Sequence, residues 1–359
     1  MGHAGAAGGS NDDGKEEEEE QEVRLLSVSW NQDSSCFAAA TTADFRVFAC
    51  RGGGGFRETM RRVRAGGGGF AIAEMLFCSN IFAVVAADLP AKLELWDDHA
   101  NRVREEHRLP SDVLAVRMSR AHLAVVLDRL VRVFDLQNPA RPPRKVETAP
   151  NRRGLCCLSC HADAPSVMAC PGTTAGQVRV EDLGKKTTKL IAAHRSEVAC
   201  MAMAVDGTVL ATASVKGTLI RVFSTTDGTC LHEVRRGSDN AIIHSIALSR
   251  NLQWLAVSSD RRTLHVFSLR YTVSNAVSSL SLIKGLLPNY FSSEWSFAQF
   301  HLPEATRYIA AFGEENTVML IGMDGRCSFD PVNGGQMVRK EYFRFLKDTD
   351  TPAIRTLTT

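Results

Sequence analysis

One short pattern recurs along the chain and limits the folds that it can adopt. Four-residue runs, most of which alternate apolar and polar side chains, start at seven positions: 45, 93, 131, 178, 220, 264 and 318. Successive starts lie 48, 38, 47, 42, 44 and 54 residues apart. Such alternation is typical of a strand with one buried face. Its regular return predicts a repeat of small β-sheet units, and two unrelated domains would have to break this period.

Further apolar segments complete each unit. A second run precedes every member of the series, at 36–40, 81–86, 122–127, 167–169, 208–213, 254–257 and 308–312. A third run lies upstream in several units, at 26–30, 113–118, 198–204 and 242–248. Three recognisable strands with a variable outer one, every ~40 to 45 residues, are typical of a blade of a WD-type propeller. We therefore expect an all-β fold, a seven-bladed WD40-like β-propeller over residues 22–345.

Composition narrows the class of protein. The chain has 359 residues, of which 44% are hydrophobic, so it can bury a large core and is too long for a small disulfide-stapled fold. No run approaches the ~18 apolar residues that span a bilayer. The ten scattered cysteines and the lack of an apolar signal-peptide segment predict reduced thiols in a cytosolic protein. Residues 1–21, with Glu16–Glu20, are expected to be a disordered acidic tail, and 346–359 a flexible C-terminal tail.

Two adjacent arginines mark the most informative segment, Val234-Arg235-Arg236-Gly237. It joins two consecutive repeats, where we expect an extended chain. Neighbouring side chains of an extended segment point to opposite sides. Arg235 and Arg236 would then each serve a separate anion site, and guanidinium groups match phosphate oxygens well. The net charge of +2 is too small for general attraction to polyanions, so binding must depend on such a local cluster.

The motifs around this pair resemble those of the PROPPIN family, the phosphoinositide-binding β-propellers of autophagy. The family signature is Phe or Leu followed by Arg-Arg-Gly; here Val234 takes the first position, which predicts altered packing with phosphate binding retained. Other matching segments are 26–37, 74–77, 95–98, 113–117, 191–194, 211–221 and 291–298. Arg152-Arg153-Gly154 is a second copy of the triplet, but the family has only a structural turn there, so we assign it no ligand.

The resemblance implies two phosphoinositide sites, one on each side of the arginine pair. The first comprises His194, Ser214, Lys216, Gly217, Thr218, Arg221 and Arg235. The second comprises Arg236, Gly237, Ser259, Arg262, Thr263 and His265. Hydroxyl and imidazole donors would complete a cage around the headgroup, and Gly237 would permit a close backbone approach or a positive φ.

These residues also have structural interpretations. WD repeats often place a core-anchoring histidine at the position of His194, the threonines suit any strand, and the serines suit turns. Arg221 and His265 occupy matching positions of two blades, which repeat symmetry alone could explain. The convergence of Ser, Thr and basic residues on both sides of the arginine pair favours the binding interpretation.

Two further contacts follow from the resemblance. In the family a loop of the sixth blade inserts into the bilayer; here residues 271–281 correspond to it, with plain blade packing as the alternative. The first blades of the family recruit the autophagy-related bridge-like lipid-transfer protein, and Asn31 and Asp33 match residues of that face. The alternative for Asn31-Gln32-Asp33-Ser34 is a strand-to-strand turn, and an exposed turn can serve both purposes.

Signals for catalysis are poor. Cys157-Leu158-Ser159-Cys160-His161 matches a haem c attachment sequence in form, but such attachment requires an exported protein, so a buried strand is the better interpretation. No second pair of zinc ligands accompanies Cys170. We expect no enzyme activity, cofactor or metal, no nucleic-acid partner, and a monomer.

The resulting prediction is a scaffold that binds phosphatidylinositol 3-phosphate, and also the 3,5-bisphosphate, on autophagic and endolysosomal or vacuolar membranes. The competing class is a WD-repeat scaffold that binds only proteins and has no lipid affinity.

Overall fold

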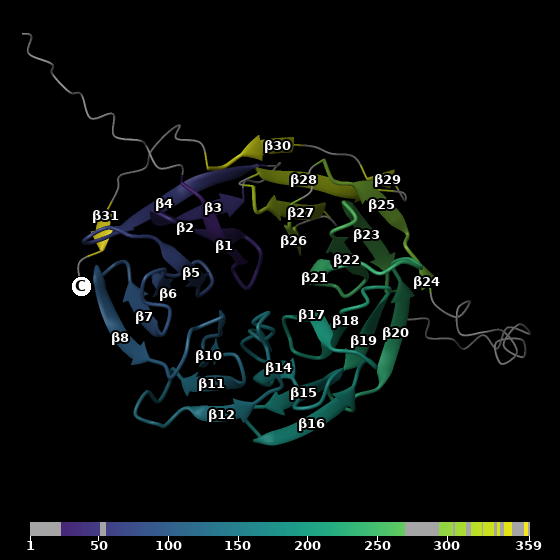
Figure 1. The fold of residues 1–359 in the computed structure, drawn as a ribbon, viewed down its shortest axis with the longest axis horizontal. Coiled ribbons are helices and arrows are strands. Elements are labelled where there is room, and N and C mark those ends of the chain that lie inside the picture. The colour runs from purple at the N-terminus through teal and green to yellow at the C-terminus, as the bar shows by residue number, and fades with distance from the viewer. Residues whose placement is uncertain are drawn as a thin grey trace, which may run out of the picture.

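The fold is an all-β propeller, in which small sheets surround a central channel (Figure 1). The computed structural model describes residues 23–50, 55–269, 294–303, 306–313, 317–324, 326–333, 336–337, 341–346 and 355–357. Two sequence predictions, the acidic tail 1–21 and the loop 271–281, lie outside these residues.

Six blades share one plan: four strands, in chain order, pair antiparallel from the channel outward. The first blade has β1 (Leu25–Trp30), β2 (Cys36–Thr41), β3 (Asp44–Cys50) and β4 (Phe56–Arg64); the second has β5 (Phe70–Met75), β6 (Ile81–Ala86), β7 (Lys92–Asp97) and β8 (Arg102–Arg108). The third has β9 (Ala115–Met118), β10 (His122–Val126), β11 (Leu130–Asp135) and β12 (Arg144–Glu147); the fourth has β13 (Cys157–Leu158), β14 (Val167–Pro171), β15 (Gln177–Asp182) and β16 (Thr187–Ala192). The fifth has β17 (Val198–Met203), β18 (Val209–Ser214), β19 (Leu219–Ser224) and β20 (Cys230–Arg235); the sixth has β21 (Ile243–Leu248), β22 (Trp254–Ser259), β23 (Thr263–Ser268) and β25 (Ala298–His301).

The repeat found in the sequence is the third strand of each of these blades. In β7, β11, β15 and β19 the apolar residues of the pattern are buried, except for the half-buried Phe134, and the intervening polar residues are only half-buried. The second strands, such as β2 and β18, are buried along their whole length because neighbouring blades cover both faces. The core therefore lies between blades, as in the cluster that joins Val222 and Val234 of the fifth blade to Ile243 and Leu255 of the sixth.

The prediction of a seven-bladed propeller is wrong: six blades are present, and the last sheet does not follow the repeat. It contains β26 (Tyr308–Phe312), β27 (Thr317–Gly322), β28 (Arg326–Asn333), β29 (Gln336–Met337) and β30 (Glu341–Arg344). Here β26 is the innermost strand and β27 the second, one position inward of the predicted places. Strand β28 then pairs with two short strands, β29 and β30. Six blades thus follow the repeat, and an irregular sheet completes the ring.

The burial of β27 explains why the sequence pattern predicted the wrong position for this strand in its sheet. All six residues of β27 are buried, as in the second strands β2 and β18 and unlike the half-buried third strands. The apolar run at 318–321 was nevertheless assigned to a third strand because it continued the interval. Periodicity identifies a buried strand but does not give its place in a sheet.

Aromatic packing closes the ring between the first and last sheets. The ring of Phe345 lies 5.3 Å from that of Phe37 and 5.1 Å from that of Phe48, and Ile321 belongs to the same cluster. The C-terminal β31 (Arg355–Leu357) adds in parallel to the outer edge of β4. The flexible tail expected at 346–359 stays a prediction. On the fifth blade, β24 (Glu294–Trp295) likewise pairs in parallel with β20.

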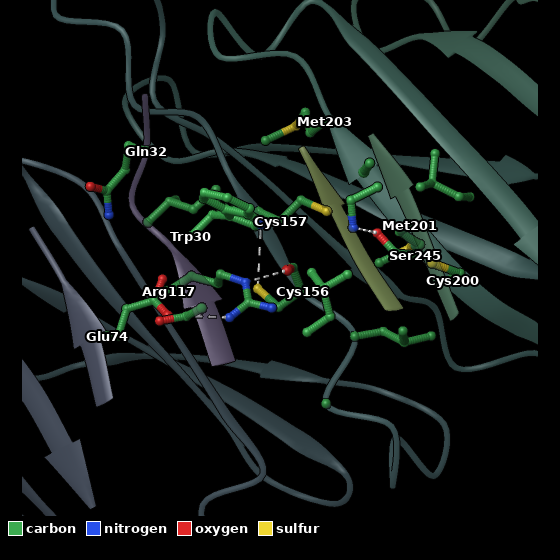
Figure 2. A pocket seen from close by; sticks show the side chains of 18 of the residues that line it. Trp30, Gln32, Glu74, Arg117, Cys156, Cys157, Cys200, Met201, Met203 and Ser245 are labelled. Atoms are coloured by element: carbon green, nitrogen blue, oxygen red, sulfur yellow. Dashed lines mark hydrogen bonds and ion pairs between the residues drawn. The ribbon is translucent and has the colours of Figure 1, made fainter. Parts of the chain in front are cut away.

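The innermost strands of all the sheets surround a central cavity of about 380 Å³. Figure 2 shows Glu74 and Arg117 facing each other within it, with Cys156 and Cys157 nearby. The Arg117 guanidinium lies 3.7 Å from the Glu74 carboxylate and donates from Nε to the Cys156 carbonyl over 3.2 Å. Burial nevertheless raises the pKa of Glu74 to about 7, so this carboxyl group is about half-ionised at neutral pH.

Candidate functional site

The arginine pair lies at the end of β20, the fourth strand of the fifth blade, and β24 pairs along the outer side of this strand. Val234 pairs with Ile220 and is fully buried against the sixth blade. Because side chains alternate along a strand, Arg235 lies on the opposite face, towards the fourth blade. The amide of Arg236 continues the pairing by donating to the Thr218 carbonyl over 3.0 Å. Arg236 therefore returns to the face of the sixth blade.

On the face of Arg235, His194 and Arg221 form one contact group. His194 Nε2 lies 2.9 Å from the hydroxyl of Thr212, and Arg221 donates to the Ala193 carbonyl over 2.7 Å. Burial and the charge of Arg221 lower the pKa of His194 to about 4, so this imidazole is neutral at pH 7. A neutral imidazole can still donate one hydrogen bond to a phosphate oxygen.

Arg221 is already engaged within the protein. Its Nε donates to the Glu233 carboxylate over 2.8 Å. Arginines at the matching position of other blades behave in the same way: Arg46 bonds to Asp44, and Arg179 bonds to Glu181. The structural interpretation of Arg221 as part of the repeat thus has direct support, and its part in ligand binding stays a prediction.

The turn between β18 and β19 holds the remaining residues of the first set. Ser214 is buried at the end of β18, and its carbonyl accepts a hydrogen bond from the Gly217 amide over 2.9 Å. Lys216 is exposed, while Thr218 is half-buried. Gly217 has a φ of +62°, and a Cβ there would lie 1.9 Å from the Ala241 carbonyl oxygen, so only glycine fits.

Arg236 fastens this turn to the segment that leads into the sixth blade. Its side chain is 8% exposed, and its Nε donates to the Gly217 carbonyl over 2.9 Å. Its Nη2 donates to the Asp239 carbonyl. The guanidinium thus has a structural role in addition to the predicted one.

On the face of Arg236, two buried polar atoms have no hydrogen-bond partner among the described residues. They are Ser259 Oγ, in a residue 1% exposed, and His265 Nδ1, in a residue 4% exposed. His265 Nε2 lies 3.1 Å from the Thr263 hydroxyl. Burial, with the charges of Arg236 and His301, lowers the pKa of His265 to about 4. Such unsatisfied groups are costly unless a ligand or water completes them.

Two residues of the second set differ from the expectation. Arg262 is exposed, with a φ of +55°, and its side chain donates to the carbonyls of Leu302 and Pro303. Gly237 does not have a positive φ, and a Cβ there would meet nothing within 4 Å. Neither a positive φ nor a close contact with another part of the described chain therefore requires glycine at position 237.

The proposed partner residues belong to the β1–β2 turn. Asn31 is 3% exposed, and its side chain bonds to Ser35 and to the Cys36 amide, which is the turn role considered as the alternative. Asp33 is half-buried; its carboxylate accepts from the Ser35 amide over 3.1 Å, and its carbonyl accepts from Arg250. Partner binding by Asn31 and Asp33 stays a prediction.

The sequence reasoning overlooked Gln32 in the same turn. Its Nε2 donates to the carbonyls of Met75 and Met118, over 2.7 and 3.1 Å, so it joins the first three blades at one end of the channel. No local pattern distinguishes this glutamine from any other turn residue.

The thiols of the segment 157–161, which matches a haem attachment sequence in form, are not reactive. Burial raises the pKa of Cys157 to about 12 and that of Cys160 to about 11, so both thiols stay protonated. Among the residues that the structure describes, no three His, Cys, Asp or Glu side chains lie close enough to hold a metal ion. Within the same part of the chain, no helix has the length and apolar character needed to cross a membrane.

Comparison with known proteins places the chain in a family. A model of the PROPPIN family matches residues 24–303. This chain belongs to the PROPPIN family. Autophagy-related protein 18e of Arabidopsis thaliana is 44% identical over 342 residues, which cover 91% of this chain and 90% of that protein. Autophagy-related protein 18 of Mycosarcoma maydis is 35% identical over 68% of this chain, and the match spans only 59% of that longer protein.

Solved structures support the fold of this PROPPIN. Hsv2p of Kluyveromyces lactis superposes with a TM-score of 0.74 at 22% identity, over 90% of this chain and 100% of that one. A complex of KlAtg21 with the coiled coil of AgAtg16 gives a TM-score of 0.70 at 22% identity, over 90% of this chain and 99% of that one. At this identity the likeness concerns the fold alone.

Proposed function

We propose that this PROPPIN is a membrane-recruited scaffold of autophagy that binds phosphatidylinositol 3-phosphate and phosphatidylinositol 3,5-bisphosphate. The observation that carries the proposal is the arrangement at the end of β20. Arg235 and Arg236 lie on opposite faces; the Arg235 face also holds the half-buried, neutral His194, and the Arg236 face holds the buried, unsatisfied Ser259 Oγ and His265 Nδ1. A phosphate group would supply acceptors for these donors, and desolvation of the site would strengthen the hydrogen bonds.

Membrane recruitment would place the protein in the cytoplasm and, peripherally, on autophagic and endolysosomal membranes. A headgroup site alone gives modest, salt-sensitive attachment, so a second contact is needed. We assign that contact to the segment 271–281. We assign this PROPPIN the role of a scaffold rather than an enzyme.

Vesicle flotation tests the lipid proposal. Wild type should float with phosphatidylcholine vesicles containing 5% phosphatidylinositol 3-phosphate, and the double variant Arg235→Thr/Arg236→Thr should not. Arg261→Thr is the matched control, because Arg261 is an exposed arginine close to the same turn. Equal flotation of wild type and the double variant would sink the proposal and favour a scaffold that binds only proteins. Thermal unfolding of each variant separates loss of binding from loss of fold.

Protein partners form the second part of the proposal. We assign the turn at Asn31 and Asp33 to recruitment of the autophagy-related bridge-like lipid-transfer protein. Because Asn31 is buried in the turn, Asp33 gives the cleaner test. An Asp33→Lys variant should lose this partner in a pull-down while it still floats with vesicles. Full retention of the partner would exclude Asp33 from the contact.

A further inference from the structure

A second cluster of basic side chains lies at one mouth of the central channel, where the inner strands begin. The mouth forms a cavity of about 690 Å³, next to the inner cavity of about 380 Å³. Arg153, His244 and Arg307 line both cavities and therefore stand at the neck between them. None of the predicted phosphoinositide residues lines either cavity. The cluster is thus separate from the arginine pair on β20.

The turn that carries Arg153 is built rigidly. The Asn151 side chain accepts from the Leu155 amide over 2.9 Å and donates to the Leu155 carbonyl over 3.0 Å. Gly154 has a φ of +65°, and a Cβ there would lie 2.9 Å from both Ala115 Cβ and the Leu114 carbonyl oxygen. Residues 151–155 therefore hold the backbone of Arg153 in one place, so a ligand would not have to order this turn.

The two arginines at the neck have no ion-pair partner among the residues that the structure describes. Arg153 and Arg307 are exposed, and neither side chain makes a hydrogen bond or ion pair with the described residues. Both charges act on the buried Cys200 thiol, which places them around the same point. Glu74, which lines the inner cavity, lies 3.7 Å from Arg117, and the negative charge of Asp260 acts on His244. Arg152, at the outer rim, forms a long ion pair of 3.9 Å with Asp128, and its side chain is 86% exposed.

A neighbouring imidazole adds a donor or acceptor to the same neck. His244 Nδ1 is buried and has no hydrogen-bond partner in the described part of the chain. Burial and the charge of Arg307 lower the pKa of His244, so at neutral pH this side chain adds no positive charge to the neck. A bound anion would favour its protonation and gain a further charged hydrogen bond.

We propose that the mouth of the channel, at Arg153, His244 and Arg307, binds a small soluble polyphosphate such as an inositol polyphosphate. Guanidinium groups bind phosphate oxygens in pairs of parallel hydrogen bonds, and several phosphates on one ring could reach several arginines at once. Cavities of about 300 to 1,000 Å³ hold ligands of this size. We choose a soluble ligand rather than a membrane headgroup because the neck lies inside the ring of inner strands.

Isothermal titration with inositol hexakisphosphate tests this proposal. The Arg235→Thr/Arg236→Thr background removes the proposed lipid sites, so one saturable site is expected there. Arg153→Ala or Arg307→Ala should each weaken binding at least about tenfold, the effect of losing one charge-assisted pair. Arg108→Ala is the control, because Arg108 lies on the outer strand β8 with 85% of its side chain exposed. Inositol, which lacks phosphate, should not bind.

Three results would overturn the proposal: no saturable binding, equal affinity of the neck variants and the control, or binding to phosphoinositide vesicles in this background without binding to the soluble ligand. The last result would assign the neck to a membrane headgroup instead. In the wild-type background, Arg153→Ala and Arg307→Ala should float with vesicles as wild type does. This measurement shows that the variants are folded. It also distinguishes a failure of polyphosphate binding at the channel mouth from a failure of the proposed lipid binding at Arg235 and Arg236.

Discussion

Replacement of Arg236 by alanine should destabilise the fold as well as weaken lipid binding. The side chain is 8% exposed and donates to the carbonyls of Gly217 and Asp239. These bonds tie the β18–β19 turn to the segment that leads into the sixth blade. Without them the Gly217 carbonyl loses its charged donor in a buried place.

The size of the effect follows from the two bonds. A hydrogen bond that involves a charged group contributes roughly 1.5 to 3 kcal/mol. Asp239 is exposed, so its carbonyl can bond to water after the substitution, whereas the Gly217 carbonyl lies in a buried residue. We therefore expect the free energy of unfolding to fall by about 2 to 3 kcal/mol, with most of the loss from the Gly217 bond.

Guanidinium chloride unfolding followed by tryptophan fluorescence measures this loss. Arg261→Ala is the matched control: Arg261 donates twice to the Asn240 carbonyl, over 3.2 and 2.7 Å, but is exposed, so its removal should cost less than about 0.5 kcal/mol. A loss for Arg236→Ala no larger than that of the control would refute the structural role. Such a result would leave Arg236 with ligand binding alone.

Three other predictions concern the same framework. The pKa of His194 and of His265 is about 4 in the folded protein and 6.5 for a free side chain, so between these values the unfolded chain binds more protons. The free energy of unfolding should therefore be highest above about pH 6.5 and decrease towards pH 4. In melting curves recorded across this pH range, His265→Gln should make the decrease smaller. Gly217→Ala should place its Cβ against the Ala241 carbonyl and lower the unfolding free energy by at least about 2 kcal/mol. Gln32→Ala should cost about 1 to 3 kcal/mol in urea unfolding, because two carbonyls at the channel end lose their donor; an unchanged midpoint would contradict the bridge between blades.

Local sequence patterns predicted where the strands lie along the chain, but not always the position of each strand within its sheet. The alternation at 220–223 correctly identified β19, and the extended segment at 234–236 placed the two arginines on opposite faces. The run at 318–321 was correctly predicted as a strand but assigned to the wrong position of its sheet, because a strand buried on both faces has no pattern that distinguishes second from third.

The candidate sites divide in the same way. The sequence identified Arg221 and Asn31, but only the structure shows that Glu233 already pairs with one and that a turn already uses the other. Nothing in the sequence near Arg153 indicated a shared cavity with Arg307, since 154 residues separate them and the ring alone brings them together.

The amino-acid sequence by itself determined the β-repeat, the family and the alternation that separates Arg235 from Arg236, because these depend on short-range backbone geometry and on motifs. The tertiary structure decided which polar groups are satisfied, which are left buried without partners, and which charges meet at the channel mouth. Those properties arise from packing between blades that are distant in the chain, where burial and charge depend on neighbours that no local pattern specifies.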